Sequence, residues 1–332
     1  MQQRKIGHLG ETSVLGIGAM SFSDFYGETD EAASHAILDR ALDAGVSHID
    51  TANIYGMGKS EKAIGTWFKA NPGKRDKMFL ATKAGISSGI GAAARGFDNA
   101  PAYLEDCLND SLARLGVDHV DLFYIHRRDQ NIEIEEVCET LAQFVKAGKI
   151  RGFGFSEIAP HSLRRAAKVH PVAAVQSEYS LQTRQPELGL TQACAALNTA
   201  LVAFSPVGRG MLTDRPHDAA KVATMPWMAN NPRFSGQNLL ANIAATAPFR
   251  AYARDLGLSA AGLAIAWVHA QGDHIVSIPG TRSVAHFEEL IAGARAELSA
   301  DQLAEISRLL PVGWAHGDRY AAAQWAGPEN YC

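Results

Sequence analysis

Short apolar runs recur along the chain, and each is followed by a polar or glycine-rich loop and then by a helical pattern. Near-continuous runs of this length are typical of strands that are buried on both faces of a sheet. Eight runs of this kind lie at residues 14–20, 46–51, 78–83, 121–126, 152–156, 173–179, 201–206 and 275–280. The pattern therefore predicts eight buried strands separated by helices.

The segments between these runs have the apolar spacing of amphipathic helices. After Asp30, apolar side chains at positions 33, 37, 41 and 44 lie on one helical face, and Gly45 follows as a C-terminal cap. Similar patterns precede Gly116 and Gly148. Strand and helix alternating eight times predict an α/β fold, a (β/α)8 TIM barrel that forms a single domain over residues 1–332. A doubly wound sheet is the alternative.

Two stretches, 208–240 and 311–332, show neither pattern and are too long for ordinary connections. We expect them to be binding loops. Two glycine-rich stretches, LGIGAMS (15–21) and GIGAAA (89–94), partly match a dinucleotide-binding fingerprint. Neither leads directly from a strand into a helix with all the required small residues, so we expect no Rossmann fold.

Composition excludes several classes of function. The chain has 332 residues and a formal net charge of −4, which gives no support to a nucleic-acid partner or a polybasic membrane contact. No apolar run is long enough to span a membrane, and the N-terminus has no secretory apolar segment. The four cysteines are scattered without a CxxC pair, so we expect no zinc site, no disulfide framework and a cytoplasmic location.

Chemically active side chains follow several predicted strands, and in a barrel these strand ends form one mouth. Asp50 ends the second run, with Tyr55 just beyond, while Lys83 ends the third and His126 the fourth. Taken singly, Lys83 could be an ordinary charge at a strand end and His126 a satisfied core histidine. Together, a carboxylate-anchored ammonium would lower the pKa of the phenol, and a neutral imidazole would orient a carbonyl oxygen. This set predicts proton delivery to a carbonyl group.

Longer motifs surround these residues along the chain. They are HIDTANIYGMGKSE (48–61), ATKAG (81–85), LFYIHRRD (122–129), KAGKIRGFGFSE (146–157), VQSEYSL (175–181), AFSPVGRGMLTD (203–214) and IPGTRS (278–283). In this order the motifs resemble the aldo-keto reductase family over residues 14–290. The similarity is strongest to the bacterial and plant branch that includes pyridoxal reductase-like and auxin-induced-like members.

The resemblance implies an enzyme that binds NADPH or NADP⁺ on the barrel and reversibly reduces an aldehyde or ketone to an alcohol. Hydride would leave nicotinamide C4, with Tyr55 as proton donor, Lys83 held by Asp50 to lower the Tyr55 pKa, and His126 positioning the carbonyl. The alternative is a regulatory subunit that holds NADP(H) for a channel-like partner and turns over little. A non-redox barrel enzyme is a third possibility.

The resemblance also implies the cofactor contacts. Ser156 and Gln176 would hold the carboxamide, and Phe204 would stack on the nicotinamide where most relatives have tyrosine. Arg282 would match a 2′-phosphate, which favours NADPH over NADH. The other expected contacts are Gly18, Met20, Ser205, Val207, Gly208, Arg209, Gly210, Leu212, Gly280, Thr281, His286 and Glu289. Glu157 and Leu290 stand where many relatives have asparagine.

The substrate pocket is expected to be lined by Met20, Phe25, Tyr26, Tyr55, Arg127 and the terminal stretch. That stretch contains Trp314, Tyr320, Trp325 and Tyr331, which predicts either a cap that favours bulky carbonyl compounds or packing that fixes the tail. The small-molecule partner is a carbonyl substrate such as a pyridoxal-like aldehyde, an α-ketoaldehyde or a cyclic ketone. The sequence does not indicate an oligomeric state.

Overall fold

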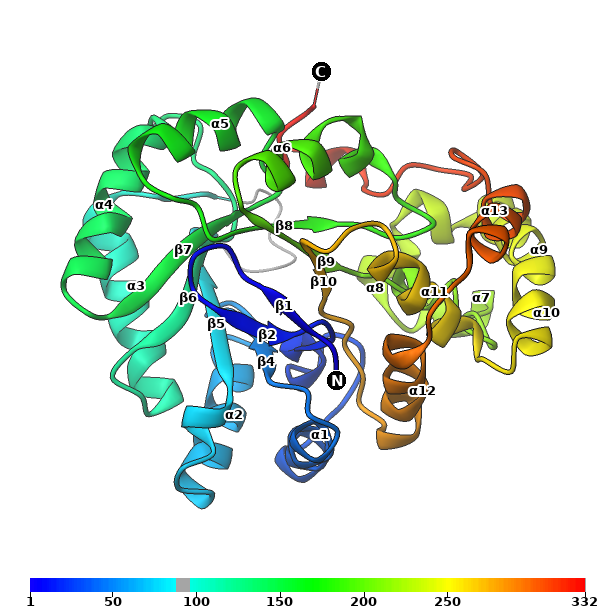
Figure 1. Ribbon diagram of the computed structural model, residues 1–332, viewed down its shortest axis with the longest axis horizontal. Helices are drawn as coiled ribbons and strands as arrows, with labels where there is room; N and C mark the ends of the chain where they lie inside the picture. The colour runs from blue at the N-terminus through cyan, green and yellow to red at the C-terminus, as the bar shows by residue number, and fades with distance from the viewer. Residues whose placement is uncertain (88–95, 332) are drawn as a thin grey trace.

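Eight parallel strands form one closed sheet (Figure 1). The computed structural model describes residues 1–87 and 96–331. The strands are β3 (Gly16–Gly18), β4 (His48–Asp50), β5 (Phe79–Ala84), β6 (Val120–Ile125), β7 (Ile150–Ser156), β8 (Ala174–Glu178), β9 (Ala200–Phe204) and β10 (Ile275–Ser277). Hydrogen bonds from Ser277 N to Val14 O (3.0 Å) and from Gly18 N to Pro279 O (2.9 Å) join the last strand to the first. The barrel prediction is confirmed, and the doubly wound alternative is wrong.

Helices surround this barrel, as Figure 1 shows. They are α1 (Glu31–Asp43), α2 (Lys59–Ala70), α3 (Pro101–Leu115), α4 (Ile134–Lys146), α5 (Pro160–Val169), α6 (Leu190–Ala196), α11 (Ala260–His269) and α12 (Val284–Arg295). The predicted start of α1 is confirmed, because the Asp30 side chain accepts a hydrogen bond from Ala33 N. Gly45, Gly116 and Gly148 follow their helices with φ angles of 77°, 66° and 72°, the left-handed conformation that such caps require.

The prediction that residues 208–240 form an irregular loop is wrong. The stretch contains η4 (Gly208–Gly210), α7 (Ala219–Ala223), α8 (Pro226–Ala229), η5 (Pro232–Phe234) and the start of α9 (Gly236–Ala245). Helices of three to five residues are too short to show an amphipathic period, which explains the error. Met211, Val222, Met228 and Phe234 pack together in a core of their own under these turns. Farther along lie α10 (Ala247–Asp255), α13 (Ala300–Leu309) and η6 (Ala322–Gln324).

A hairpin that the sequence did not predict lies across the N-terminal ends of the barrel strands. Its strands are β1 (Gln3–Lys5) and β2 (Glu11–Ser13), drawn in dark blue in Figure 1. The Arg4 guanidinium donates to the carbonyl oxygens of Gly272 (2.7 Å) and His269 (2.8 Å), which fixes the hairpin to the barrel. Ile6 is fully buried and closes this end of the interior.

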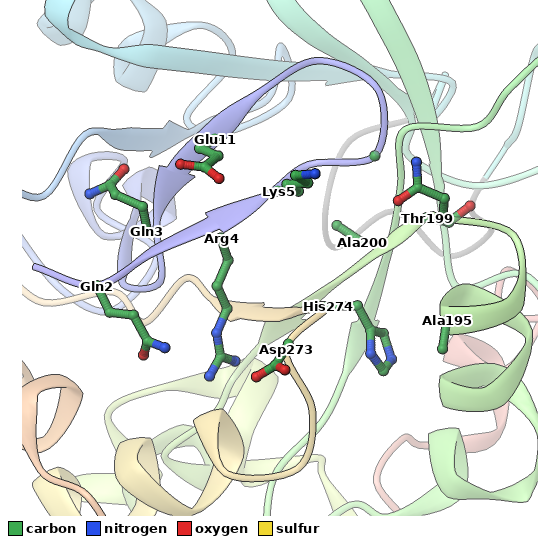
Figure 2. Close-up of a pocket in the computed structure, with 12 residues that line it drawn as sticks. Gln2, Gln3, Arg4, Lys5, Glu11, Ala195, Thr199, Ala200, Asp273 and His274 are labelled. Atoms are coloured by element: carbon green, nitrogen blue, oxygen red, sulfur yellow. The ribbon is translucent and has the colours of Figure 1, made fainter.

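A hollow of about 330 Å³ lies beside the hairpin (Figure 2). Asp273 and His274, which line it, immediately precede β10, and Ala200 is the first residue of β9. The hollow is therefore at the N-terminal ends of the strands, the end that serves stability in such barrels. The candidate site must be sought at the opposite end.

The two glycine-rich stretches have different outcomes. LGIGAMS contains β3 and the short 3-10 helix η1 (Ala19–Phe22), and this arrangement is not the strand-to-α-helix turn of a dinucleotide fingerprint. GIGAAA (89–94) lies outside the described residues. None of the helices in the described ranges combines the length and the apolar character that a bilayer crossing requires.

Candidate active site

Three of the expected catalytic side chains form a continuous chain of contacts at the C-terminal ends of β4 and β5. The Lys83 ammonium donates to the Asp50 carboxylate, to Thr51 O at 2.7 Å and to the Tyr55 hydroxyl at 3.3 Å. Lys83 is 0% exposed, Asp50 1% and Tyr55 8%. The ammonium thus has its counter-charge on one side and the phenol on the other. The structure brings these side chains together as the sequence predicted.

The pKa of Tyr55 is raised, whereas the sequence analysis predicted that it is lowered. Burial raises the pKa of Tyr55 above its ordinary value, and the opposing effect of the Lys83 ammonium does not fully offset this rise. Burial works against the charged form of Lys83 itself, but Asp50 and Tyr55 raise the pKa of Lys83 above its usual range. Lys83 therefore acts in the predicted direction, while the predicted net lowering is wrong because the sequence did not show how deeply the phenol is buried.

His126 lies against Tyr55 from the end of β6. Their ring centroids are 5.7 Å apart, with the planes at 85°. Met20 packs on the small apolar cluster that contains Tyr55. A carbonyl oxygen placed between the phenol and the imidazole would meet two polar groups on an otherwise apolar surface.

Ser156 and Gln176, the expected carboxamide contacts, end β7 and lie within β8, and they are paired in register. Gln176 Nε2 donates to the Asp50 carboxylate at 2.8 Å, and the Ser156 hydroxyl accepts from Arg127 at 2.9 Å. Both side chains are thus at the mouth beside the Asp50–Lys83 pair. Their expected contact with the carboxamide stays a prediction.

Ser60 and Glu61, at the end of the motif HIDTANIYGMGKSE (48–61), support this arrangement. Ser60 donates to Ala19 O at 2.8 Å and contacts the Thr51 hydroxyl at 2.8 Å. Glu61 is completely buried and accepts a hydrogen bond of 2.6 Å from Thr82, the residue before Lys83. These bonds attach the N-terminal turn of α2 to β5 and to the loop that carries Tyr55.

The expected pyrophosphate loop has an unusual backbone. Ser205, Gly208, Arg209 and Gly210 have φ angles of 50°, 60°, 55° and 93°. Consecutive left-handed residues turn backbone N–H groups toward one side, which forms a concavity suited to an anion. The Leu212 side chain is fully buried and Val207 packs on the core, so these two residues could contact a cofactor through their backbone.

The residues after β10 lie against the first strand. A Cβ on Gly18 would be 2.5 Å from Ile278 O, and one on Gly280 would be 2.9 Å from Gly18 O, so both positions require glycine for this approach. Thr281 and Arg282 precede α12, whose N-cap Ser283 accepts from His286 N. Arg282 donates to Glu28 O at 3.0 Å from an exposed position.

His286 and Glu289 lie on α12, where His286 is exposed and Glu289 is half-buried. Leu290, which stands where relatives have asparagine, is buried in the main core. Phe204, at the end of β9, is half-buried. The expected cofactor residues thus lie after neighbouring strands and at the start of one helix, consistent with an extended ligand.

A buried charge cluster that the sequence did not predict joins the tail to this mouth. Arg319 pairs with Glu157 and lies 3.5 Å from Glu178. Arg209 pairs with Glu178 at 2.7 Å, and Arg233 lies 3.7 Å from it. The available signal was Glu178, an acid at the end of the run 173–179, since a carboxylate that is buried there requires a counter-charge. Nothing in the local pattern identifies Arg319 as its partner.

The expected pocket residues Phe25 and Tyr26 pack in an aromatic cluster with Trp227. Phe25 stacks on Trp227 at 4.8 Å, and Tyr26 meets Trp227 edge-on at 5.2 Å. Burial raises the pKa of Tyr26 to about 12, with Arg209, Tyr55 and Tyr320 among the groups that act on it electrostatically. Tyr26 is therefore near both Tyr55 and Tyr320, and its place in a substrate pocket stays a prediction.

The tail is attached by packing and charge. The Arg319 guanidinium lies over the rings of Tyr320 (4.7 Å) and Trp325 (5.0 Å), and the Trp314 indole donates to Leu181 O at 2.8 Å. Tyr331 packs against the main core. These contacts favour the interpretation in which the aromatic residues fix the tail to the barrel.

We expect Arg319→Met to release the tail. Glu157 would lose its guanidinium partner, and the rings of Tyr320 and Trp325 would lose the cation that lies over them. Limited proteolysis with chymotrypsin, which cleaves beside the aromatic residues of the tail, should become about 10-fold faster. Arg308→Met is the matched control, since its partner Glu305 is one helical turn away on the surface. An unchanged cleavage rate in Arg319→Met would show that this cluster does not hold the tail.

Comparison with known proteins places the chain among related barrels. An aldo-keto reductase from Schizosaccharomyces pombe, yakc [NADP(+)], is 36% identical over 320 residues, covering 96% of this chain and 94% of that protein. Probable aldo-keto reductase 1 of Glycine max is 35% identical, covering 96% of this chain and 92% of its own. The structure of glycerol dehydrogenase AKR11B4 from Gluconobacter oxydans is similar with a TM-score of 0.83 and 26% identity, covering 93% of this chain and 94% of the other.

The holo form of aldo-keto reductase AKR11C1 from Bacillus halodurans is also similar, with a TM-score of 0.75, 25% identity and coverage of 98% and 99% of the two chains. The family model described as the Aldo/keto reductase family matches residues 14–311, which span all eight barrel strands and the ends from which Asp50, Tyr55, Lys83 and His126 arise. This chain therefore belongs to the aldo/keto reductase family.

Proposed function

We propose that this protein reduces an aldehyde or ketone to an alcohol with NADPH, and that Tyr55 donates the proton from its hydroxyl. The observation that carries the proposal is the buried chain of contacts from the Asp50 carboxylate through the Lys83 ammonium to the Tyr55 hydroxyl. This chain of contacts supports Tyr55 as a proton donor, and the Tyr55 ring centroid lies 5.7 Å from that of His126.

Each residue has a separate part in the proposed reaction. Tyr55 is neutral at physiological pH, because its pKa is raised, and it can therefore donate a proton to a developing alkoxide. The adjacent Lys83 ammonium stabilises the phenolate that remains, since the pair is buried where charges interact strongly. Asp50 holds the ammonium in place. We assign the His126 imidazole to the carbonyl oxygen, which it would orient beside Tyr55.

NADPH, when bound, supplies the hydride that reduces the carbonyl carbon. The residues present are suited to holding it. The consecutive left-handed residues Gly208, Arg209 and Gly210 turn backbone N–H groups toward one side, which suits an anionic pyrophosphate. Ser156 and Gln176 are assigned to the carboxamide and Phe204 to the nicotinamide face. The name of the S. pombe relative includes NADP(+), which supports the choice of cofactor.

NADPH oxidation across aldehydes, dicarbonyls and ketones, with NADH measured in parallel, tests this proposal. We expect turnover of at least one class and higher kcat/KM with NADPH. Binding of NADPH, followed by quenching of tryptophan fluorescence, separates two kinds of failure. Binding without turnover of any carbonyl compound would fit a regulatory subunit, and no binding would point to a non-redox barrel enzyme.

Arg282 should set the preference for NADPH, since its exposed guanidinium lies just before α12 and can pair with a 2′-phosphate. We expect Arg282→Ala to lower the ratio of kcat/KM for NADPH over NADH by about 10-fold or more. Arg295→Ala, at the other end of the same helix, is the control. An unchanged ratio in Arg282→Ala would remove Arg282 from the cofactor site.

A further inference from the structure

The guanidinium of Arg127 is buried at the mouth of the barrel, with only 6% of the residue exposed. Its Nη1 donates to His126 O at 2.6 Å and to the Ser156 hydroxyl at 2.9 Å. Its Nε is buried and has no partner among the described residues, and its Nη2 donates no hydrogen bond within those ranges. More than half of the donor capacity of this side chain is therefore unused.

Neighbouring arginines at the mouth each have a carboxylate. Arg128, the next residue, pairs with Glu329 at 2.9 Å, and Arg319 and Arg209 pair with Glu157 and Glu178. Arg127 forms no ion pair within residues 1–87 and 96–331. The remaining residues, 88–95 (SGIGAAAR) and Cys332, include no Asp or Glu, so their side chains offer no carboxylate. A buried cation without a counter-charge is costly, which indicates an anion that these side chains do not supply.

The position of Arg127 narrows the choice of anion. Burial raises the pKa of Tyr55, whereas the positive charge of Lys83 lowers it. The positive charge of Arg127 also lowers the pKa of Tyr55, so Arg127 acts on the proposed catalytic phenol. The proposed phosphate sites follow β9 and β10, and β7 and β8 separate β6 from β9 in the sheet. The nicotinamide end of the cofactor carries no negative charge. The remaining anion beside Tyr55 and His126 is one carried by the substrate.

We propose that Arg127 is a specificity-determining residue that binds a carboxylate on the carbonyl substrate. The preferred substrates are then aldehydes or ketones that carry a carboxylate, rather than their neutral analogues. A guanidinium is suited to this because its planar N–H groups match the geometry of a carboxylate. This inference rests on the proposed carbonyl reduction and adds a substrate class to it.

The test compares acids with their methyl esters, which keep the carbonyl and remove the charge. Suitable pairs are pyruvate, 4-oxobutanoate and 4-formylbenzoate with the corresponding methyl esters, since they place the carboxylate at increasing distances from the carbonyl. For at least one pair we expect kcat/KM to favour the acid by about 10-fold or more. If the esters are equal or better in every pair, the inference is overturned, and if no compound oxidises NADPH, the proposed function fails instead.

Variants separate recognition from a structural role. In Arg127→Met the acid-to-ester ratio should fall by about 10-fold, and Arg127→Lys should keep a larger part of it because the charge remains. A residue that only held Ser156 in place would affect acids and esters alike and leave the ratio unchanged. Arg128→Met is the control, as the adjacent arginine already has Glu329 as its partner. NADPH binding, measured by fluorescence quenching, verifies that each variant is folded. A ratio that persists in Arg127→Met would overturn the inference.

Discussion

Tyr55→Phe should lower kcat for carbonyl reduction by about 10²- to 10⁴-fold, the range in which a positioned general acid contributes. The substitution removes one hydroxyl and keeps the ring against His126 and Met20. Lys83 keeps Asp50 and Thr51 O as partners, so the ion pair remains intact. NADPH oxidation with a reactive aldehyde measures the change. The dissociation constant for NADPH should stay within about twofold of the wild-type value, because the hydroxyl is not assigned to the cofactor.

The pH dependence gives a second measure of the same residue. Because the pKa of Tyr55 lies above its usual value of about 10, the donor is protonated throughout the neutral range. The rate of carbonyl reduction should therefore depend little on Tyr55 ionisation from about pH 6 to about pH 9, and it should decline only at higher pH. Alcohol oxidation requires the phenolate and should rise with pH. A kcat close to that of the wild type in Tyr55→Phe would show that another group donates the proton.

The part of the site that could be predicted is the part fixed by strand register. Gly18, Asp50 and Ser156 are the last residues of β3, β4 and β7, and Gly18 is paired in register with Asp50, and Ser156 with Gln176. In a parallel sheet, residues that end consecutive apolar runs must converge on one mouth. This rule needs no knowledge of distant contacts, which explains why residues from different strands were grouped correctly.

The contacts that could not be predicted join segments far apart in sequence without a repeated pattern. Arg319 and Glu157 are separated by 162 positions, and each occurs in a polar segment where a charge is ordinary. The β1–β2 hairpin has strands of three residues, QRK and ETS, too short and too polar to show alternation. The raised pKa of Tyr55 belongs to the same class, because burial depends on the whole fold.

Asp50→Asn should lower the free energy of unfolding by about 3–5 kcal/mol, since it leaves a completely buried ammonium without its counter-charge. Asparagine keeps the shape of the side chain, so the decrease in unfolding free energy measures the effect of removing the negative charge. Urea denaturation measures it, and the double variant Asp50→Asn, Lys83→Met is the matched control. With both charges removed, the double variant should be more stable than the single one, as no unpaired charge remains.

The sign of the pH dependence follows from Lys83. In the wild type its folded pKa is raised, so its contribution to stability is complete below the unfolded pKa of about 10.4 and is lost as the pH rises through the folded value. In Asp50→Asn, burial without a counter-charge lowers the pKa of Lys83, and the stability that depends on the neutral amine returns as the pH rises. The difference in unfolding free energy between the two proteins should therefore be largest near neutral pH and narrow toward about pH 10. A loss below about 1 kcal/mol at neutral pH would mean that Lys83 is not held as a buried cation, and the proposed stabilisation of the Tyr55 phenolate would lose its basis.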